Sequence, residues 1–216
     1  MTNNTQKQID KNLPNKLTIL RIILVPVFII VLWLPMISGG SINDLCTRII
    51  ASVIFIFSAI TDFVDGKLAR KYNLVSNFGK FMDPLADKFL CIGAMLAMVL
   101  IFDGAPRVWL IISLMITIFR ELAVSSMRLI AKNAEGLVIA AAMPGKIKTF
   151  SQCIFIPLLL LEGYIYALIP NFPEALPILS IFADLPLSFI CMIIMNFFTI
   201  YSGIQYLNTY KKYIID

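Results

Sequence analysis

Histidine is absent from the 216 residues, and charged residues make up only 14% of them. Without an imidazole group, a Ser-His-Asp triad and the histidine ligands of catalytic zinc sites are excluded. Cysteine is sparse, and its four copies stand singly without the C-x-x-C spacing of metal or redox motifs, so we interpret them as small buried hydrophobic residues. Chemistry must therefore depend on carboxylates, lysines, arginines, hydroxyls or a metal bound by oxygen.

Hydrophobic residues are in large excess, at 59% of the chain, against about 45–50% in soluble domains. The excess falls in blocks of about twenty residues, the length that crosses a bilayer as a helix. We therefore expect an all-α integral membrane protein with six transmembrane helices. The predicted spans are residues 17–36, 46–61, 84–102, 108–130, 147–169 and 178–200.

The basic residues predict how these spans are oriented. Six spans place both termini on one side, and that side receives every Lys and Arg except Arg48 and Arg107. By the positive-inside rule, both termini are cytoplasmic. We expect a cytoplasmic N-terminal segment at 1–16, a catalytic membrane domain at 17–210 and a cytoplasmic tail at 211–216. The net charge of +5 favours contact with anionic membrane lipids or phosphate substrates, and no nucleic-acid partner is expected.

Four aspartates lie around the predicted cytoplasmic loop between the second and third spans. Asp62 and Asp65 are three residues apart, and Asp83 and Asp87 are four apart, so each pair shares a helix face. If the second and third spans form an antiparallel pair, the two acidic faces meet at the membrane boundary. A purely structural role is also open for Asp83, as the cap of a helix whose first residue is Pro84.

Four carboxylates brought this close repel one another, and one or two divalent cations would relieve the repulsion. Ligands that are all oxygen favour Mg²⁺ or Mn²⁺, and two such ions suit phosphoryl chemistry. Gly66 and Ala69 leave room for a nucleotide on the acidic face, and Arg70 can bind phosphate oxygens. A simpler interpretation is that the acids only form ion pairs with neighbouring basic residues, namely Lys67, Arg70, Lys80 and Lys88.

The full pattern D-x2-D-G-x2-A-R-x8-G-x3-D-x3-D, from Asp62 to Asp87, resembles the signature of the CDP-alcohol phosphotransferase family. The resemblance implies a fold of six transmembrane helices, one or two Mg²⁺ or Mn²⁺ ions, and release of CMP. It also implies that Asp62, Asp65 and Asp83 are mainly metal ligands. Asp87 would be the general base and a further candidate ligand. The residues implied at the cytidine and diphosphate site are Gly66, Ala69 and Arg70.

Three further segments, 13–21, 120–125 and 145–149, resemble the bacterial phosphatidylglycerophosphate synthases, a branch of this family. This resemblance implies CDP-diacylglycerol and glycerol 3-phosphate as substrates, a homodimer, and the bacterial cytoplasmic membrane, with the active site facing the cytoplasm. Cardiolipin synthases share some of these motifs. Less favoured functions are those of a phosphatidylserine or phosphatidylinositol synthase, an intramembrane prenyltransferase, and a cation transporter that uses the four aspartates as its ion site.

The same resemblance suggests nucleotide-side contacts for Asn15, Thr18 and Arg21, which recur every three residues; a snorkelling helix end is the competing interpretation. Glycerol 3-phosphate is a small dianion that needs basic residues near the metal site. The candidates are Arg120, Arg128, Lys146 and Lys148. A structural Arg120–Glu121 pair is less favoured, because adjacent residues point apart on a helix. Lys146 and Lys148 also fit an ordinary positive flank.

Overall fold

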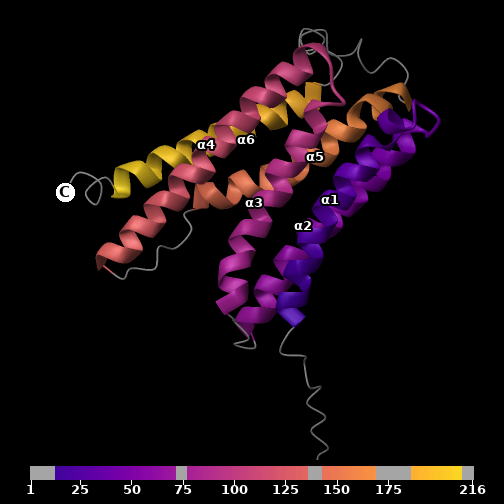
Figure 1. Cartoon of the computed structure of the whole chain (residues 1–216). Helices are drawn as coiled ribbons and strands as arrows, with labels where there is room; N and C mark the ends of the chain where they lie inside the picture. Colours follow the sequence, from indigo (N-terminus) through magenta and orange to yellow (C-terminus); the bar gives the residue numbers. More distant parts are fainter. Residues whose placement is uncertain (1–12, 72–76, 136–142, 169–185, 211–216) are drawn as a thin grey trace, which may run out of the picture.

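The computed structural model describes residues 13–71, 77–135, 143–168 and 186–210, and within these ranges the chain is helical with no strand. Six helices follow one another, alternating in direction (Figure 1). Their bounds are α1 Leu13–Ile37, α2 Asp44–Lys71, α3 Asn77–Val99, α4 Gly104–Glu135, α5 Met143–Leu168 and α6 Pro186–Tyr210.

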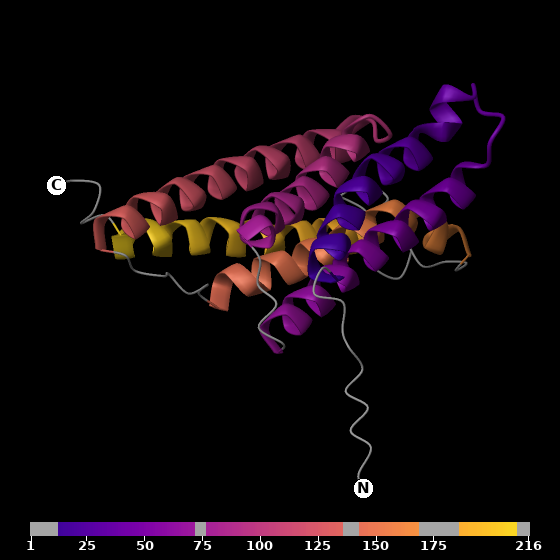
Figure 2. The same cartoon turned by 60° about the horizontal axis from the view of Figure 1, so that its bottom comes forward.

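Each predicted span corresponds to one helix, and several helices continue past the apolar stretch. α2 runs on to Lys71, α4 to Glu135 and α6 to Tyr210, where we expected spans ending at 61, 130 and 200. The predicted start of the sixth span, residues 178–185, lies outside the described residues. These polar extensions lie at the end of the bundle where α1, α3 and α5 begin, and the helices diverge toward that end (Figures 1 and 2).

Four helices in the described part of the chain are long and apolar enough to cross a membrane, and they lie within α1, α2, α4 and α6. Their outward faces carry large exposed apolar side chains, for example Ile23, Phe119 and Phe197 at 54%, 75% and 60% exposure. In water, such a surface would be an aggregation hazard, whereas lipid solvates it. The prediction of a helical membrane protein is confirmed at this level.

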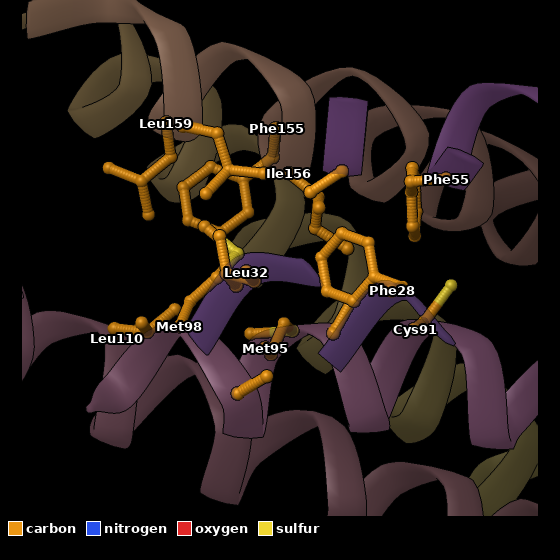
Figure 3. Packing of buried hydrophobic residues seen from close by; sticks show 14 of the residues in the cluster. Phe28, Leu32, Phe55, Cys91, Met95, Met98, Leu110, Phe155, Ile156 and Leu159 are labelled. Carbon is orange, nitrogen blue, oxygen red and sulfur yellow. The ribbon is translucent and has the colours of Figure 1, made fainter. Parts of the chain in front are cut away.

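The core is built around α1, which packs against both α2 and α3, while α2 and α3 have little contact with each other. Figure 3 shows Phe28 and Leu32 of α1 between Met95 of α3 and Phe155 of α5. These four side chains are at most 1% exposed. α1 can approach α3 closely because Gly93 has no side chain: a Cβ there would lie 3.0 Å from Val25 Cγ1. Small residues serve this purpose between membrane helices.

A buried carboxylate fixes the start of α6. Glu162 of α5 is 1% exposed and accepts hydrogen bonds from the backbone amides of Leu187 at 2.6 Å and Ser188 at 2.7 Å. The Ser188 hydroxyl donates to the same carboxylate. The first amides of a helix lack partners within the helix, and a carboxylate there also favours the helix dipole. Glu162 therefore ties α5 to α6 at the end of the bundle opposite the signature aspartates.

Candidate active site

Arg21 of α1 joins the two halves of the acidic signature. Its side chain is fully buried, and its Nη1 lies 2.6 Å from Asp62 Oδ1 on α2 and 2.7 Å from Asp87 Oδ1 on α3. One nitrogen thus contacts carboxylates from two helices. The two aspartate side chains are 41% and 50% exposed, so the guanidinium lies beneath carboxylates that remain open on their outer side.

Thr18 makes the next contact, one helical turn before Arg21. Its hydroxyl is 1% exposed and donates to Asp83 Oδ1 at 2.6 Å. Three of the four signature aspartates therefore lie beside the first turns of α1, with Asp62 and Asp87 on Arg21 and Asp83 on Thr18. Their arrangement differs from our expectation, because α2 and α3 do not form a closely packed pair; α1 contacts both and supplies the groups that connect their acids.

The suggested role of Asp83 as a helix cap is wrong. α3 begins at Asn77, so Asp83 lies within the helix and Pro84 is an internal proline. The remaining signature residues on α2, Asp65, Gly66, Ala69 and Arg70, lie in its last turns; their side chains are outside the described part of the structure. Their assignment to metal and nucleotide binding stays a prediction. Asn15 is half-buried one turn before Thr18.

The donor set can be tested for its fit to a metal. Asp62, Asp83 and Asp87 offer only carboxylate oxygens, which are the ligands that Mg²⁺ and Mn²⁺ prefer. Among the residues whose side chains are described, no three such groups stand close enough to form a complete site. The side chain of Asp65 is not one of those described. The oxygens of Asp62 and Asp87 nonetheless lie within contact of one cationic nitrogen. The two carboxylates thus offer oxygen ligands of the kind that a hard cation takes, beside a guanidinium that already offsets part of their charge.

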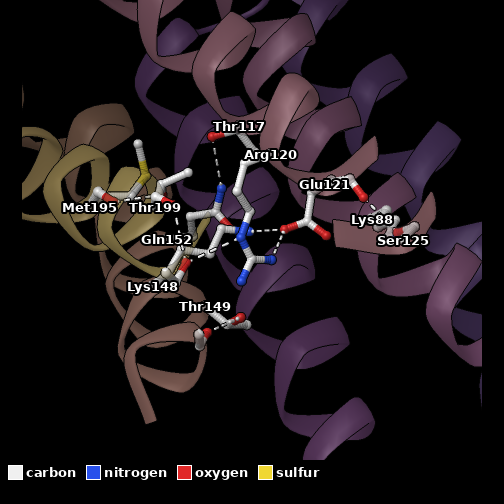
Figure 4. Close-up of polar contacts among 12 residues, drawn as sticks. Lys88, Thr117, Arg120, Glu121, Ser125, Lys148, Thr149, Gln152, Met195 and Thr199 are labelled. Atoms are coloured by element: carbon white, nitrogen blue, oxygen red, sulfur yellow. Dashed lines mark hydrogen bonds and ion pairs between the residues drawn. The ribbon is translucent and has the colours of Figure 1, made fainter. Parts of the chain in front are cut away.

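A second cluster of charged residues surrounds Arg120 on α4 (Figure 4). Arg120 Nη1 lies 2.7 Å from Glu121 Oε1, and its Nε donates to Ser202 Oγ on α6 at 3.2 Å. Two glycines border the side chain: a Cβ at Gly145 would lie 3.3 Å from Nη2, and one at Gly203 would lie 3.4 Å from Cγ. The arginine therefore occupies a narrow space between α4, α5 and α6.

Lys148 of α5 completes the cluster. It is 4% exposed, and its Nζ lies 2.8 Å from the same Glu121 Oε1 that contacts Arg120. Two cations from two different helices, α4 and α5, thus share one carboxylate oxygen, as Figure 4 shows. The Arg120–Glu121 pair that we judged less favourable does form, because both side chains are long enough to bend toward each other although their Cα–Cβ bonds diverge.

Sequence reasoning did not assign Lys88 or Glu121 to the site. Lys88 follows Asp87 on α3 and donates to the Ser125 hydroxyl on α4, which in turn donates to the backbone carbonyl of Glu121 at 2.6 Å. These contacts tie the residue that follows Asp87 on α3 to the backbone of Glu121 on α4. A signal for both residues was present, since ionisable side chains in apolar spans are usually functional or paired.

The remaining predicted cations are less informative. Lys146 is exposed in the first turn of α5, two residues before the buried Lys148. Arg128 lies on α4, but its side chain is outside the described set. The structure therefore brings together Arg120 and Lys148 of the four candidates, and the roles of all four stay predictions.

Comparison with known proteins agrees with this geometry. Residues 11–201 match the family model described as CDP-alcohol phosphatidyltransferase. Three relatives carry the name CDP-diacylglycerol–glycerol-3-phosphate 3-phosphatidyltransferase. The protein from Bacillus subtilis is 42% identical over 90% of this chain and 93% of its own length. Those from Rickettsia felis and Haemophilus influenzae are 36% and 34% identical over 95% of this chain and 99% and 96% of their own lengths. The chain belongs to the CDP-alcohol phosphatidyltransferase family.

Proposed function

We propose that the protein transfers the phosphatidyl group of CDP-diacylglycerol to sn-glycerol 3-phosphate, giving phosphatidylglycerol phosphate and CMP. The names of the relatives specify this donor and this acceptor. The observation that carries the proposal is the joint placement of two clusters at one end of the bundle. Asp62, Asp83 and Asp87 suit the divalent cations that would neutralise a diphosphate, and Arg120 with Lys148 suits an anionic acceptor.

On the donor side, the residues that would hold one or two Mg²⁺ or Mn²⁺ ions are Asp62, Asp65, Asp83 and Asp87. When bound, such an ion supplies positive charge that neutralises the diphosphate and the departing CMP. The half-exposed carboxylates of Asp62 and Asp87 leave their outer faces available for this role. We assign the border of the cytidine diphosphate group to Gly66, Ala69 and Arg70 and to the first turns of α1 with Asn15 and Thr18, while Arg21 supports this site from behind the carboxylates of Asp62 and Asp87.

On the acceptor side, Arg120 and Lys148 would bind the phosphate of glycerol 3-phosphate, with Arg128 and Lys146 as further cations. Bound in this way, the primary hydroxyl of the acceptor points toward α3, where Asp87 takes its proton. The hydroxyl oxygen forms a bond to the phosphorus that carries the diacylglycerol, and the bond from this phosphorus to the CMP oxygen breaks. We expect direct displacement, because the described residues offer no activated nucleophile for a covalent intermediate.

We further propose that all six helices span the bacterial cytoplasmic membrane, with both termini and the active site on the cytoplasmic side. The supporting observation is that both charged clusters lie at the end where the sequence concentrates its Lys and Arg residues. In this arrangement the acyl chains of the donor lipid stay in the bilayer while its headgroup reaches the aspartates. Residues 1–16 and 211–216 would be cytoplasmic, flanking the membrane domain 17–210, and we keep a homodimer as the expected assembly.

The test offers CDP-diacylglycerol with Mg²⁺ or Mn²⁺ to purified protein together with one acceptor at a time. Glycerol 3-phosphate, serine, inositol and phosphatidylglycerol are compared, and both CMP and the lipid product are measured. We expect phosphatidylglycerol phosphate with glycerol 3-phosphate and no lipid product with the other three acceptors. The Asp62→Asn variant should lose activity by orders of magnitude, whereas Asp103→Asn, a change at an 89% exposed aspartate at the opposite end, should retain it. Cardiolipin as the main product would contradict the proposal.

A further inference from the structure

Arg21 holds an unusual position for a residue at a nucleotide site. Its side chain has no exposed surface, and its Nη1 contacts Asp62 and Asp87 from the buried side. The carboxylates themselves remain about half open to the outside. A ligand that approaches from the open side would meet the carboxylates first and the guanidinium only behind them.

The surroundings explain why a buried cation is needed there. Asp62 and Asp87 come from different helices, and their mutual repulsion favours a separation of α2 from α3 unless a cation or a shared proton offsets it. Few direct contacts between α2 and α3 oppose that separation, because α1 packs between them. Thr18 gives Asp83 a neutral hydroxyl rather than a charge. Among the contacts described, Arg21 is thus the group that neutralises this pair of acids.

We propose that Arg21 is the internal counter-cation of the acidic cluster, neutralising Asp62 and Asp87 while no divalent cation is bound. A metal bound to the outer face of the same carboxylates would then also neutralise their negative charge, from the side opposite Arg21. The inference rests on the proposed function in that the aspartates bind a divalent cation. It assigns Arg21 as a positioning residue, acting through the carboxylates rather than by direct contact with the nucleotide.

Removing Arg21 should increase the metal-induced rise in melting temperature for two reasons. Among the described contacts, the Arg21→Met substitution removes the cation that Asp62 and Asp87 share, so the metal-free variant should be less stable than the wild type. Bound metal would restore the missing charge, and it would no longer be repelled by a neighbouring guanidinium. A ligand that binds the native state raises the melting temperature according to its affinity, so the rise on adding metal should be larger in the variant.

The experiment measures the melting temperature of the purified full-length protein in detergent, first with EDTA and then over a MgCl₂ or MnCl₂ titration. The loss of helical circular dichroism reports unfolding. A thiol-reactive dye is unsuitable, because Cys46, which we expected to be buried, is an exposed free cysteine. The matched control is Arg48→Met, which removes another arginine beside an aspartate: Arg48 Nε lies 2.9 Å from Asp44 Oδ2 at the opposite end. This control also loses stability, but its metal response should equal that of the wild type.

We expect the metal-induced rise to be greater in Arg21→Met than in the wild type and in Arg48→Met, by about 2–4 °C or more. An equal or smaller rise in Arg21→Met would overturn the proposal. The melting temperature does not depend on catalysis, so its outcome can be judged separately from the proposed transferase activity. If the wild type shows a metal-induced rise but releases no CMP with any acceptor, the transferase proposal fails while the Arg21 comparison still stands or falls by its own result.

Discussion

Replacing Arg120 with methionine gives the sharpest test of the acceptor site. The substitution keeps a long side chain in the narrow space beside Gly145 and Gly203 and removes the guanidinium. A hydrogen bond to a charged group contributes about 1.5–3 kcal/mol, and each 1.4 kcal/mol corresponds to about a factor of ten. We therefore expect the KM for glycerol 3-phosphate to rise about 10- to 150-fold, with a smaller change in the KM for CDP-diacylglycerol.

The assay follows CMP release while glycerol 3-phosphate is varied at saturating CDP-diacylglycerol. Arg107→Met is the matched control, since Arg107 is a partly exposed arginine that pairs with Asp103 at the opposite end, 2.8 Å away. Its kinetic constants should equal those of the wild type. Melting temperatures of both variants identify any loss caused by unfolding. An Arg120→Met enzyme that stays folded and keeps its KM for glycerol 3-phosphate within about twofold would refute the assignment, because less than about 0.5 kcal/mol of binding would then be lost.

Three further predictions concern different parts of the molecule. Asp87→Asn should lower kcat by about 10²- to 10⁴-fold, the usual contribution of a general base; near-full turnover at saturating substrates would remove Asp87 from that role. Glu162→Gln should lower stability by about 1.5–3 kcal/mol, because the amides at the start of α6 and the Ser188 hydroxyl lose a charged acceptor. The measurement is the melting temperature, and unchanged KM values in the folded fraction are expected. Gly93→Val should destabilise the protein by about 1–3 kcal/mol through overpacking against Val25; a melting temperature equal to that of the wild type would show that α1 and α3 can separate without cost.

Much of this arrangement was predictable from the sequence because its signals are local. Apolar blocks of membrane-spanning length predicted the helices, and the spacing of Asp62, Asp83 and Asp87 predicted that acids from neighbouring helices would meet. The exact helix ends were harder to predict. Hydropathy detects the apolar part of a helix, whereas hydrogen bonding continues into polar turns, as in α2 beyond residue 61 and in α3 before Pro84.

The contacts between helices could not be inferred from spacing. Nothing in the local pattern of α1 shows that it packs between α2 and α3, and so the partners of Thr18 and Arg21 emerged only from the structure. The shared carboxylate of Glu121 is similar: the sequence shows Arg120 beside it, but Lys148 reaches it from a helix 27 residues further along the chain. Long side chains such as those of Arg120 and Glu121 can also bend toward each other, so the directions of their Cα–Cβ bonds did not predict this contact.

Gly145 beside Arg120 imposes a limit on how this enzyme can evolve. A methyl group at Gly145 would lie 3.3 Å from Nη2 of this arginine and would shift the guanidinium by a few tenths of an ångström without altering any charge, whereas one at Gly203 would make an ordinary contact with Cγ at 3.4 Å. If Arg120 binds the acceptor as proposed, we expect substitutions at Gly145 to change the preference among alcohol acceptors. Relatives that use a different acceptor would be expected to differ here before they differ at their aspartates.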